Sequence, residues 1–248
     1  CITMIFNTLI RTTFISLLIG SSAFASPVQW DPVYDTQDAS DLFSQGQLVE
    51  AFNGAYNTAD DEMVDSYTTT IGNTTFIEAP GLLSEDNNSD FLAGNTSGDA
   101  GYDVLLSTLD FGGGSGETIL QTGSGNLTLG NTYMIQLWFT DIREHMDMRN
   151  MIFGDNAGNT VLVNSFGSGL GQYAIGYFTA DSDSQSLTLS PDGFGNSHLN
   201  GYQIRDITGL GLVPVQNITQ VSTPVSLFAF FGLLAIAGLS PRKNNDKK

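Results

Sequence analysis

The feature that most constrains the fold is a series of short apolar runs between Ser26 and Val221. No part of this region keeps a helical period for long, and the runs are separated by Gly, Asn, Asp and Ser, which are the residues of turns. Residues 173–178 and 186–189 alternate in polarity, as expected in a sheet with one face in water. Residues 133–139 are apolar on both faces, which predicts a central strand. The region is therefore predicted to be all-β.

The apolar runs give a set of expected strands and one expected hairpin. The strands are Leu48–Phe52, Thr74–Ile77, Val104–Thr108, Glu117–Leu120, Thr132–Phe139, Asn150–Phe153, Thr160–Val163, Gln172–Ala180, Ser186–Leu189 and Leu199–Asp206. Residues 155–159 join two of these runs and are typical of a hairpin loop. Strands of this number and length favour a two-sheet antiparallel β-sandwich with jelly-roll topology.

The negative charge of this region excludes some classes of binding partner. Between Ser26 and Val221 there are 25 acidic residues and three arginines, which leaves a formal charge of −22. Such a body repels phosphate backbones, so no nucleic acid is expected as a partner, and it repels acidic polysaccharides unless divalent cations bridge the two. Each arginine is expected to be held by carboxylates. The 41% hydrophobic content of the chain favours a folded core over disorder.

The N-terminal end has the three parts of a secretory signal peptide. Arg11 supplies a positive flank, residues 12–20 form an apolar run too short to anchor the chain, and residues 23–25 make a small-x-small cleavage motif. We expect export through the Sec translocon and cleavage between Ala25 and Ser26. The alternative is a buried N-terminal helix. Because the chain's one cysteine precedes this signal, no disulfide, thiol nucleophile or cysteine-ligated zinc is expected in the mature protein.

The C-terminal end is also tripartite. A short motif that ends in Pro224 precedes an apolar run, 225–239, and a basic tail, 240–248, which the positive-inside rule keeps in the cytoplasm. This end resembles the PEP-CTERM sorting signal of Gram-negative bacteria, which an exosortase recognises and cleaves. Ser222 and Thr223 depart from the proline and glutamate that are usual in that motif. The alternative is a permanent membrane anchor formed by the short transmembrane helix.

The two ends and the body divide the chain into four expected parts. These are a signal peptide, 1–25; a β-sandwich domain, 26–211; a linker, 212–221; and a sorting signal, 222–248, whose motif covers 221–224.

Several segments of the body resemble a family of secreted bacterial sandwich domains that also occur in PEP-CTERM proteins. The segments are Trp30–Val33, Gly46–Gly54, Gly101–Ser107, Leu137–Arg143, Gly171–Asp181 and Leu199–Asp206. These domains look like the galactose-binding-like jelly rolls, the class that includes malectin-type and many carbohydrate-binding modules. The resemblance covers about Trp30 to Thr208 and implies a fold, and it carries no established activity.

The body contains no catalytic motif. It lacks the sequence patterns of zinc proteases, serine hydrolases and phosphate-binding loops. The glycine-rich residues 112–116 are followed by no lysine and are typical of a hairpin loop. We therefore expect a protein that is not an enzyme, although so many carboxylates leave a glycan hydrolase as an alternative.

Residues 141–149, which follow the expected central strand, hold the densest group of functional side chains. In one interpretation this is a ligand loop, with Trp138 or Tyr177 as a stacking platform. In the preferred interpretation the loop is fixed by a salt bridge and the tryptophan belongs to the core. The side chains that would contact sugar hydroxyls in the first interpretation are Asp141, Arg143 and His145.

Calcium is the expected cofactor, because it takes several hard oxygen ligands and extracellular levels suffice for weak sites. The family resemblance implies a structural calcium between the opening and the last strand, where Glu50 and Asp206 stand. Further candidates are Asp155, Asn156 and Asn159 in one loop, and Asp86, Asn88 and Asp90 in another. A solvated acidic loop is the alternative for each.

Together these features indicate a secreted, non-catalytic β-sandwich protein at the surface or in the extracellular matrix of a Gram-negative bacterium. The expected role is to bind carbohydrate or to contribute to an extracellular polysaccharide or biofilm matrix. The alternatives are a glycan-active hydrolase and a purely structural surface protein without a small ligand.

Overall fold

The structure, a computed structural model, describes residues 27–54, 67–79, 81–83, 85–86, 95–112, 116–143 and 148–212. All of them belong to one compact unit, Cys1–Val215, and a second unit, Gln216–Lys248, lies outside the described residues. The predicted cleavage site at Ala25 and Ser26 lies outside them too, as do the sorting residues Ser222, Thr223 and Pro224.

The described residues are mostly strands. The strands are β1 (Gln29–Trp30), β2 (Tyr34–Asp35), β3 (Gln47–Gly54), β4 (Thr69–Ile71), β5 (Thr74–Ala79), β6 (Glu85–Asp86), β7 (Asp110–Gly112), β8 (Thr118–Thr122), β9 (Thr132–Phe139), β10 (Asn150–Asp155), β11 (Thr160–Asn164), β12 (Gln172–Thr179), β13 (Gln185–Asp192), β14 (Ser197–Leu199) and β15 (Gly201–Asp206). A 3₁₀ helix, η1 (Ala39–Asp41), and an α-helix, α1 (Ala100–Ser107), complete the set.

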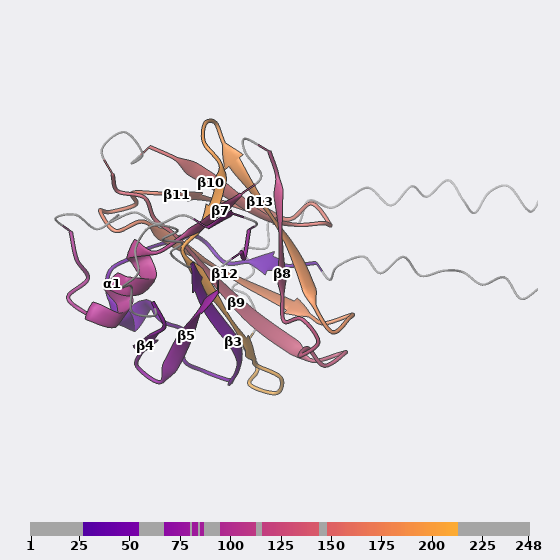
Figure 1. Cartoon of the computed structure of the whole chain (residues 1–248). Coiled ribbons are helices and arrows are strands. Elements are labelled where there is room, and N and C mark those ends of the chain that lie inside the picture. Colours follow the sequence, from indigo (N-terminus) through magenta and orange to yellow (C-terminus); the bar gives the residue numbers. More distant parts are fainter. Residues whose placement is uncertain are drawn as a thin grey trace, which may run out of the picture. The chain divides into compact units, whose positions relative to one another are not determined.

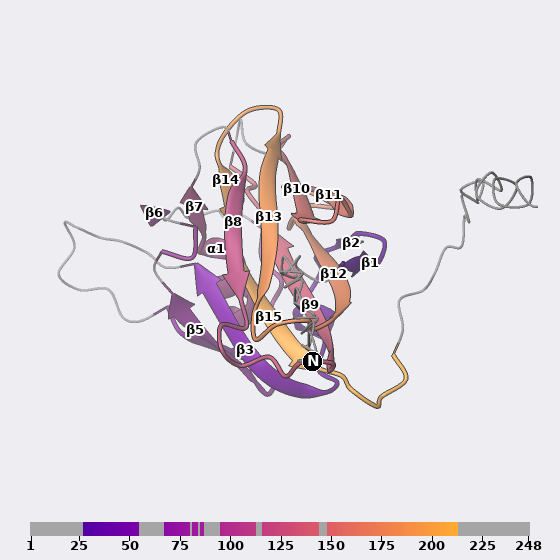
Figure 2. The ribbon, with the colours of Figure 1, turned by 90° about the vertical axis from the view of Figure 1, so that its right-hand side faces the viewer.

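The strands form three sheets. The large sheet has the order β1-β12-β9-β15-β3-β5-β4, with β2 also paired to β12. A four-stranded sheet has the order β11-β10-β13-β8, and a small sheet has the order β14-β7-β6 (Figures 1 and 2). The predicted antiparallel pairing holds for every pair but one, because β3 and β5 run parallel.

A first core lies between the large and the four-stranded sheets. Tyr133, Ile135 and Leu137 of β9 enter it from the large sheet, and Phe153 of β10 and Leu189 of β13 enter it from the other. Alternate residues of each strand therefore face one shared interior, as the polarity pattern predicted. The antiparallel β architecture expected from the sequence is confirmed at this level.

A second core covers the opposite face of the large sheet. Trp138 of β9 packs there against Phe76 and Tyr102, with ring centroids 5.6 and 6.4 Å apart. Strand β9 is thus buried on both faces, and its predicted central position is confirmed by its place between β12 and β15. Helix α1 contributes much of this core, and Figure 1 shows it beside β4.

The predicted strand Val104–Thr108 is wrong, because this segment belongs to α1. Its buried residues Tyr102, Leu105 and Leu106 have the i, i+3, i+4 spacing of one helix face. The Asp99 side chain caps the helix by accepting a hydrogen bond from the Tyr102 amide at 2.9 Å. The short apolar run imitated a strand because the helix has only two turns.

The predicted strand Leu199–Asp206 is interrupted at Asn200, which separates β14 from β15. The side chain of Asn200 accepts a hydrogen bond from the Thr140 amide at 2.7 Å and donates to the carbonyls of Leu106 and Thr108, both at 2.9 Å. Asn53, opposite Gly201 in β3, is likewise buried, and its amide donates to the Tyr67 carbonyl at 2.8 Å. These two asparagines supply partners for backbone groups that would otherwise be buried alone.

Strand β1 packs against Gly176 of the large sheet. A Cβ built on Gly176 would lie 2.5 Å from a methyl group of Val28 and 2.8 Å from the Trp30 ring, so only glycine lets β1 pack here. The Val28 amide donates to Asp155 at 2.6 Å. The other donors to the Asp155 carboxylate are the Ala157 amide and both the amide and the side chain of Asn159. The predicted 155–159 hairpin loop is therefore confirmed, and its first residue also holds β1.

We expect the Asp155→Asn variant to be less stable by about 1–3 kcal/mol at neutral pH, because an amide cannot accept all four hydrogen bonds. Burial raises the pKa of Asp155, but hydrogen bonds from Asn159 and Val28 outweigh it and the pKa is lowered. The carboxylate's contribution is thus fully present above pH about 4 and is lost as the pH falls through the folded pKa. Urea unfolding across this pH range measures both effects.

The matched control is Asp192→Asn, at an exposed position on β13 beyond Pro191. Its stability should stay within about 0.5 kcal/mol of the wild type at every pH. Equal losses in the two variants would contradict the anchoring role of Asp155.

Candidate functional site

The residues predicted for a ligand loop do not form an open site together. Trp138 has no exposed surface, and its indole N–H donates to the Tyr102 hydroxyl at 2.8 Å. No face of the ring is left for a ligand, so the stacking-platform interpretation of Trp138 is wrong and the ring belongs to the second core. Tyr177 lies on the same face and is partly buried, and its hydroxyl donates to Asp31 at 3.2 Å. Burial and the Asp31 carboxylate raise the pKa of Tyr177 well above its usual range.

Asp141 is the centre of a buried ion cluster just after β9. The Arg143 guanidinium binds it in a bidentate manner, at 2.8 Å from Nε to Oδ1 and 2.7 Å from Nη2 to Oδ2. Arg149 Nη1 lies 3.0 Å from Oδ2 and its Nη2 donates to the Asn196 carbonyl at 2.5 Å. Burial would raise the pKa of Asp141, but these hydrogen bonds and charges outweigh it and the pKa is lowered. The geometry matches the preferred interpretation, in which a salt bridge fixes the loop.

His198 lies in the same interior and has no exposed surface. Its ring centroid is 4.3 Å from that of Phe139, and Nε2 is 3.1 Å from the Thr140 carbonyl oxygen. Burial and the nearby charge of Arg149 lower its pKa to about 3. This histidine is therefore neutral at physiological pH and is not placed to exchange protons with solvent. His145, the other predicted ligand residue, lies outside the described residues.

Arg205 departs from the expectation that every arginine is held by carboxylates. Among the described residues its partners are neutral oxygens: Gln203 Oε1 at 2.9 Å, the carbonyls of Ser44 and Gly46 at 3.3 and 3.2 Å, and the Thr74 hydroxyl at 2.5 Å. These contacts fix the segment before β3 to the second face of the large sheet. Arg205 thus has a structural role that the composition of the chain did not indicate.

Of the residues proposed as calcium ligands, Asn88 and Asp90 lie outside the described residues and Asp86 is in β6. The hydrogen bonds of the others place them in two groups. In the first group, Asp155 Oδ1 accepts hydrogen bonds from the Ala157 and Asn159 amides, and Oδ2 accepts from the Val28 amide and the Asn159 side chain. These hydrogen bonds anchor the turn, and a calcium ion at this hairpin stays a prediction. Glu50 and Asp206 stand on the neighbouring strands β3 and β15, where Glu50 pairs with Ile204 and Asp206 pairs with Gln47.

Glu50 and Asp206 both hold the loop 123–131 that connects β8 to β9. Glu50 Oε1 accepts hydrogen bonds from the Gly123 amide at 2.5 Å and from the Tyr202 hydroxyl at 2.9 Å. Asp206 Oδ2 accepts from the Asn131 side chain at 2.7 Å. Among the described residues there is no group of three or more His, Cys, Asp or Glu side chains that could hold a metal. A calcium ion here would need backbone or amide oxygens in addition to the two carboxylates.

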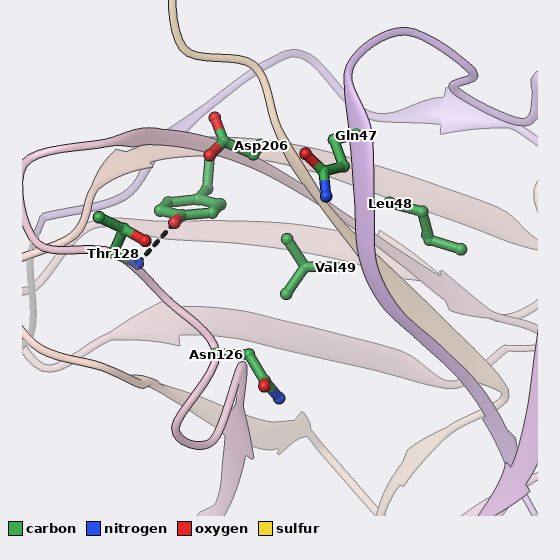
Figure 3. A pocket seen from close by; sticks show the side chains of 7 residues that line it. Gln47, Leu48, Val49, Asn126, Thr128 and Asp206 are labelled. Carbon is green, nitrogen blue, oxygen red and sulfur yellow. Dashed lines mark hydrogen bonds between the residues drawn. The ribbon is translucent and has the colours of Figure 1, made fainter.

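The loop 123–131 forms one wall of a pocket of about 300 Å³, which we call the Gln47 pocket. Its lining consists of Gln47, Leu48, Val49, Asn126, Thr128, Tyr133 and Asp206. In Figure 3 the side chains of Gln47, Asp206, Thr128 and Asn126 lie around that of Val49. The Thr128 amide donates to the Tyr133 hydroxyl at 2.7 Å, which joins the loop to the start of β9.

The lining of the Gln47 pocket has groups that could bind a small polar ligand. Two side-chain amides and two hydroxyls can both donate and accept hydrogen bonds, and Asp206 adds acceptors and the single charge of the described lining. Val49 offers an apolar surface among them. A volume of about 300 Å³ is at the lower end of the range for small-molecule sites. The pocket therefore suits one unit of a polyhydroxylated ligand.

Of the residues singled out from the sequence, only Asp206 lines this pocket. Gln47, Asn126 and Thr128 carried no signal, because a polar residue in a turn or at a strand end is ordinary on any protein surface. The pocket is assembled from β3, β9, β15 and a loop, so its members are separated by up to 159 positions in the sequence. These residues come together only because of the order in which the strands pair.

No protein-family model matches this chain, and no curated protein matches it. In the described part of the chain, no helix is both long and apolar enough to cross a bilayer. The predicted membrane segment, 225–239, lies outside that part.

We expect a calcium ion at Glu50 and Asp206 to raise the melting temperature by mass action, in excess calcium relative to chelator. The Asp206→Asn variant should lose this shift, because it removes one of the two carboxylates. Asp192→Asn is the control and should keep it. Melting curves followed by circular dichroism measure the effect, and a wild type that melts at the same temperature in both buffers would exclude the site.

Proposed function

We propose that this chain is a secreted, non-catalytic carbohydrate-binding protein of an extracellular polysaccharide matrix, and that the Gln47 pocket contacts the glycan. The observation that carries the proposal is the pocket itself, with amide, hydroxyl and carboxylate groups around an apolar side chain. Sugars present hydroxyl groups in several directions and a weakly apolar ring, which is the chemistry that such a lining complements.

The finer description of the fold belongs to the same proposal. Two antiparallel sheets that share the first core are consistent with a galactose-binding-like jelly roll, the class that the sequence resembles. That class includes many carbohydrate-binding modules. The residues that line the Gln47 pocket can be mutated to test for carbohydrate binding.

The described lining favours binding over hydrolysis. A glycosidase of the common kind uses two carboxyl groups on either side of the scissile bond. The described lining of the Gln47 pocket contains one, Asp206, and its oxygens accept hydrogen bonds from Asn131 and Thr208. Asp141, the carboxylate of the predicted ligand loop that the structure describes, is engaged by two arginines. The hydrolase is therefore the less supported alternative.

The proposed ligand is a neutral glycan. The body has a formal charge of −22, and the one charged group described in the pocket is itself a carboxylate. Uronic acids would meet like charge at long range and at contact. Neutral hexose polymers meet neither penalty.

The test is binding to immobilised galactomannan, glucomannan and dextran, with polygalacturonate as the acidic comparison. The mature body should bind at least one neutral polymer and release no reducing ends from it. Gln47→Ala should weaken binding about three- to tenfold, the cost of one or two hydrogen bonds. Gln121→Ala, an exposed glutamine on β8 outside the pocket, is the control and should bind like the wild type.

Each other result favours a different class of protein. Release of reducing ends, lost on Asp206→Asn, would make the protein a hydrolase. A wild type that binds none of the polymers would replace carbohydrate binding by the purely structural alternative.

We also propose the export route on the strength of the two ends of the chain. Sec export would remove residues 1–25, and exosortase-type processing would remove the C-terminal sorting signal at the outer side of the inner membrane. The intact mass of the secreted protein tests both. The expected N-terminus is Ser26, and a mass that still includes Lys248 would exclude C-terminal processing and favour a permanent anchor.

A further inference from the structure

Tyr34 is an exposed aromatic ring that the large sheet holds in a fixed position. Its side chain is 37% exposed, and its ring stacks on Tyr173 with centroids 5.3 Å apart and an interplanar angle of 19°. Strand β2 pairs with β12, which places the two tyrosines opposite each other. Beside them the Gln172 side chain donates to Asp35 at 2.8 Å. A ring fixed in this way loses little conformational entropy when a ligand stacks on it.

An open groove of about 430 Å³ lies beside the loop that leads into β12. Its described lining is Asn95, Thr96, Ser168, Gly169 and Leu170, which offers an amide, two hydroxyls and an aliphatic side chain but no charge. The Asn95 side chain donates to the Gly169 carbonyl at 3.0 Å and joins the two walls. This lining, like that of the Gln47 pocket, can exchange hydrogen bonds with hydroxyl groups.

A backbone hydrogen bond brings the chain that follows Tyr34 next to the loop that lines the groove. The Thr36 amide donates to the Gly171 carbonyl at 3.0 Å, and Gly171 directly follows the groove residue Leu170. Tyr34 is two residues before Thr36, so roughly 7 Å of extended chain separates the Tyr34 backbone from this hydrogen bond. We call this surface, Tyr34 with the five groove residues, the Tyr34 surface.

The Tyr34 surface lies at the opposite end of the large sheet from the Gln47 pocket. Its end of β12 is Gln172, which pairs with Phe139 at the end of β9. The pocket is lined by Tyr133 near the start of β9. Six residues of strand separate these two positions on β9, a distance of about 20 Å. The sheet is buried on both faces between them, so the two sites are rigidly spaced.

We propose that the Tyr34 surface is a second carbohydrate-binding site, and that one copy of the domain links two neutral polysaccharide chains through its two ends. This inference rests on the proposed function. It adds a second binding site and the cross-linking of polysaccharide chains. An exposed ring beside hydroxyl and amide groups supplies the stacking face that the Gln47 pocket lacks. Two weak sites on one rigid body convert monovalent binding into cross-linking when the polymer is multivalent.

The test is the agglutination of beads coated with galactomannan, glucomannan or dextran, together with binding of the protein to the same soluble polymers. The wild type should agglutinate the beads of the polymer that it binds. Tyr34→Ala and Gln47→Ala should each keep binding to the soluble polymer within about tenfold, through the remaining site, and each should lose agglutination. Tyr34→Phe keeps the ring and should agglutinate like the wild type.

Two further variants separate loss of the site from loss of the fold. Ser168→Phe places bulk at an exposed position in the groove without touching the stacked tyrosines, and it should also abolish agglutination. Phe194→Ala removes another exposed aromatic ring, which is 55% exposed and lies outside the Tyr34 surface. It should agglutinate like the wild type, and the melting temperature of each variant checks its folding.

The outcomes distinguish the inference from the proposed function. Agglutination that survives both Tyr34→Ala and Ser168→Phe would overturn the Tyr34 surface as the second site, and it would not bear on the Gln47 pocket. A wild type that binds soluble polymer but agglutinates no beads would also overturn it. A wild type that binds no polymer at all would overturn the proposed function itself.

Discussion

The burial of β9 on both faces is the constraint on which the rest of the domain depends. Its odd-numbered residues from Tyr133 to Phe139 face the four-stranded sheet, and Met134 and Trp138 face α1 and β5. Neither core can form without this strand, and its two neighbours, β12 and β15, carry the residues that border both proposed glycan sites. The strand therefore sets the distance between the two ends of the sheet as well as the stability of its faces.

The strands were predictable because the pattern that produces them is local. Alternation in residues 173–178 and a doubly apolar run in 133–139 follow directly from burial on one face or on two. Helix α1 was missed because two turns of helix give too few residues to establish a period. Arg205 was misjudged for a different reason, since its neutral partners come from distant backbone carbonyls that composition does not report.

The candidate sites were less predictable than the fold. The sequence drew attention to the dense patch at 141–149, and the described part of that patch is an ion cluster that holds its own loop. The Gln47 pocket and the Tyr34 surface consist of ordinary polar residues, a few aliphatic ones and two tyrosines, drawn from segments that meet only after the strands have paired. Function in a domain of this kind is carried by strand ends and loops, where single residues give little signal.

Asn53 and Asn200 have a chemical consequence beyond their hydrogen bonds. Each is followed by a glycine, and Asn–Gly is the dipeptide in which the backbone nitrogen most readily attacks the side-chain amide to form a succinimide. Both asparagines are buried, and the amide of Asn200 is held by three backbone groups, so neither side chain can turn toward the following nitrogen. The folded domain thereby protects its two most deamidation-prone bonds, and its chemical ageing is tied to how often the region around β14 and β15 opens.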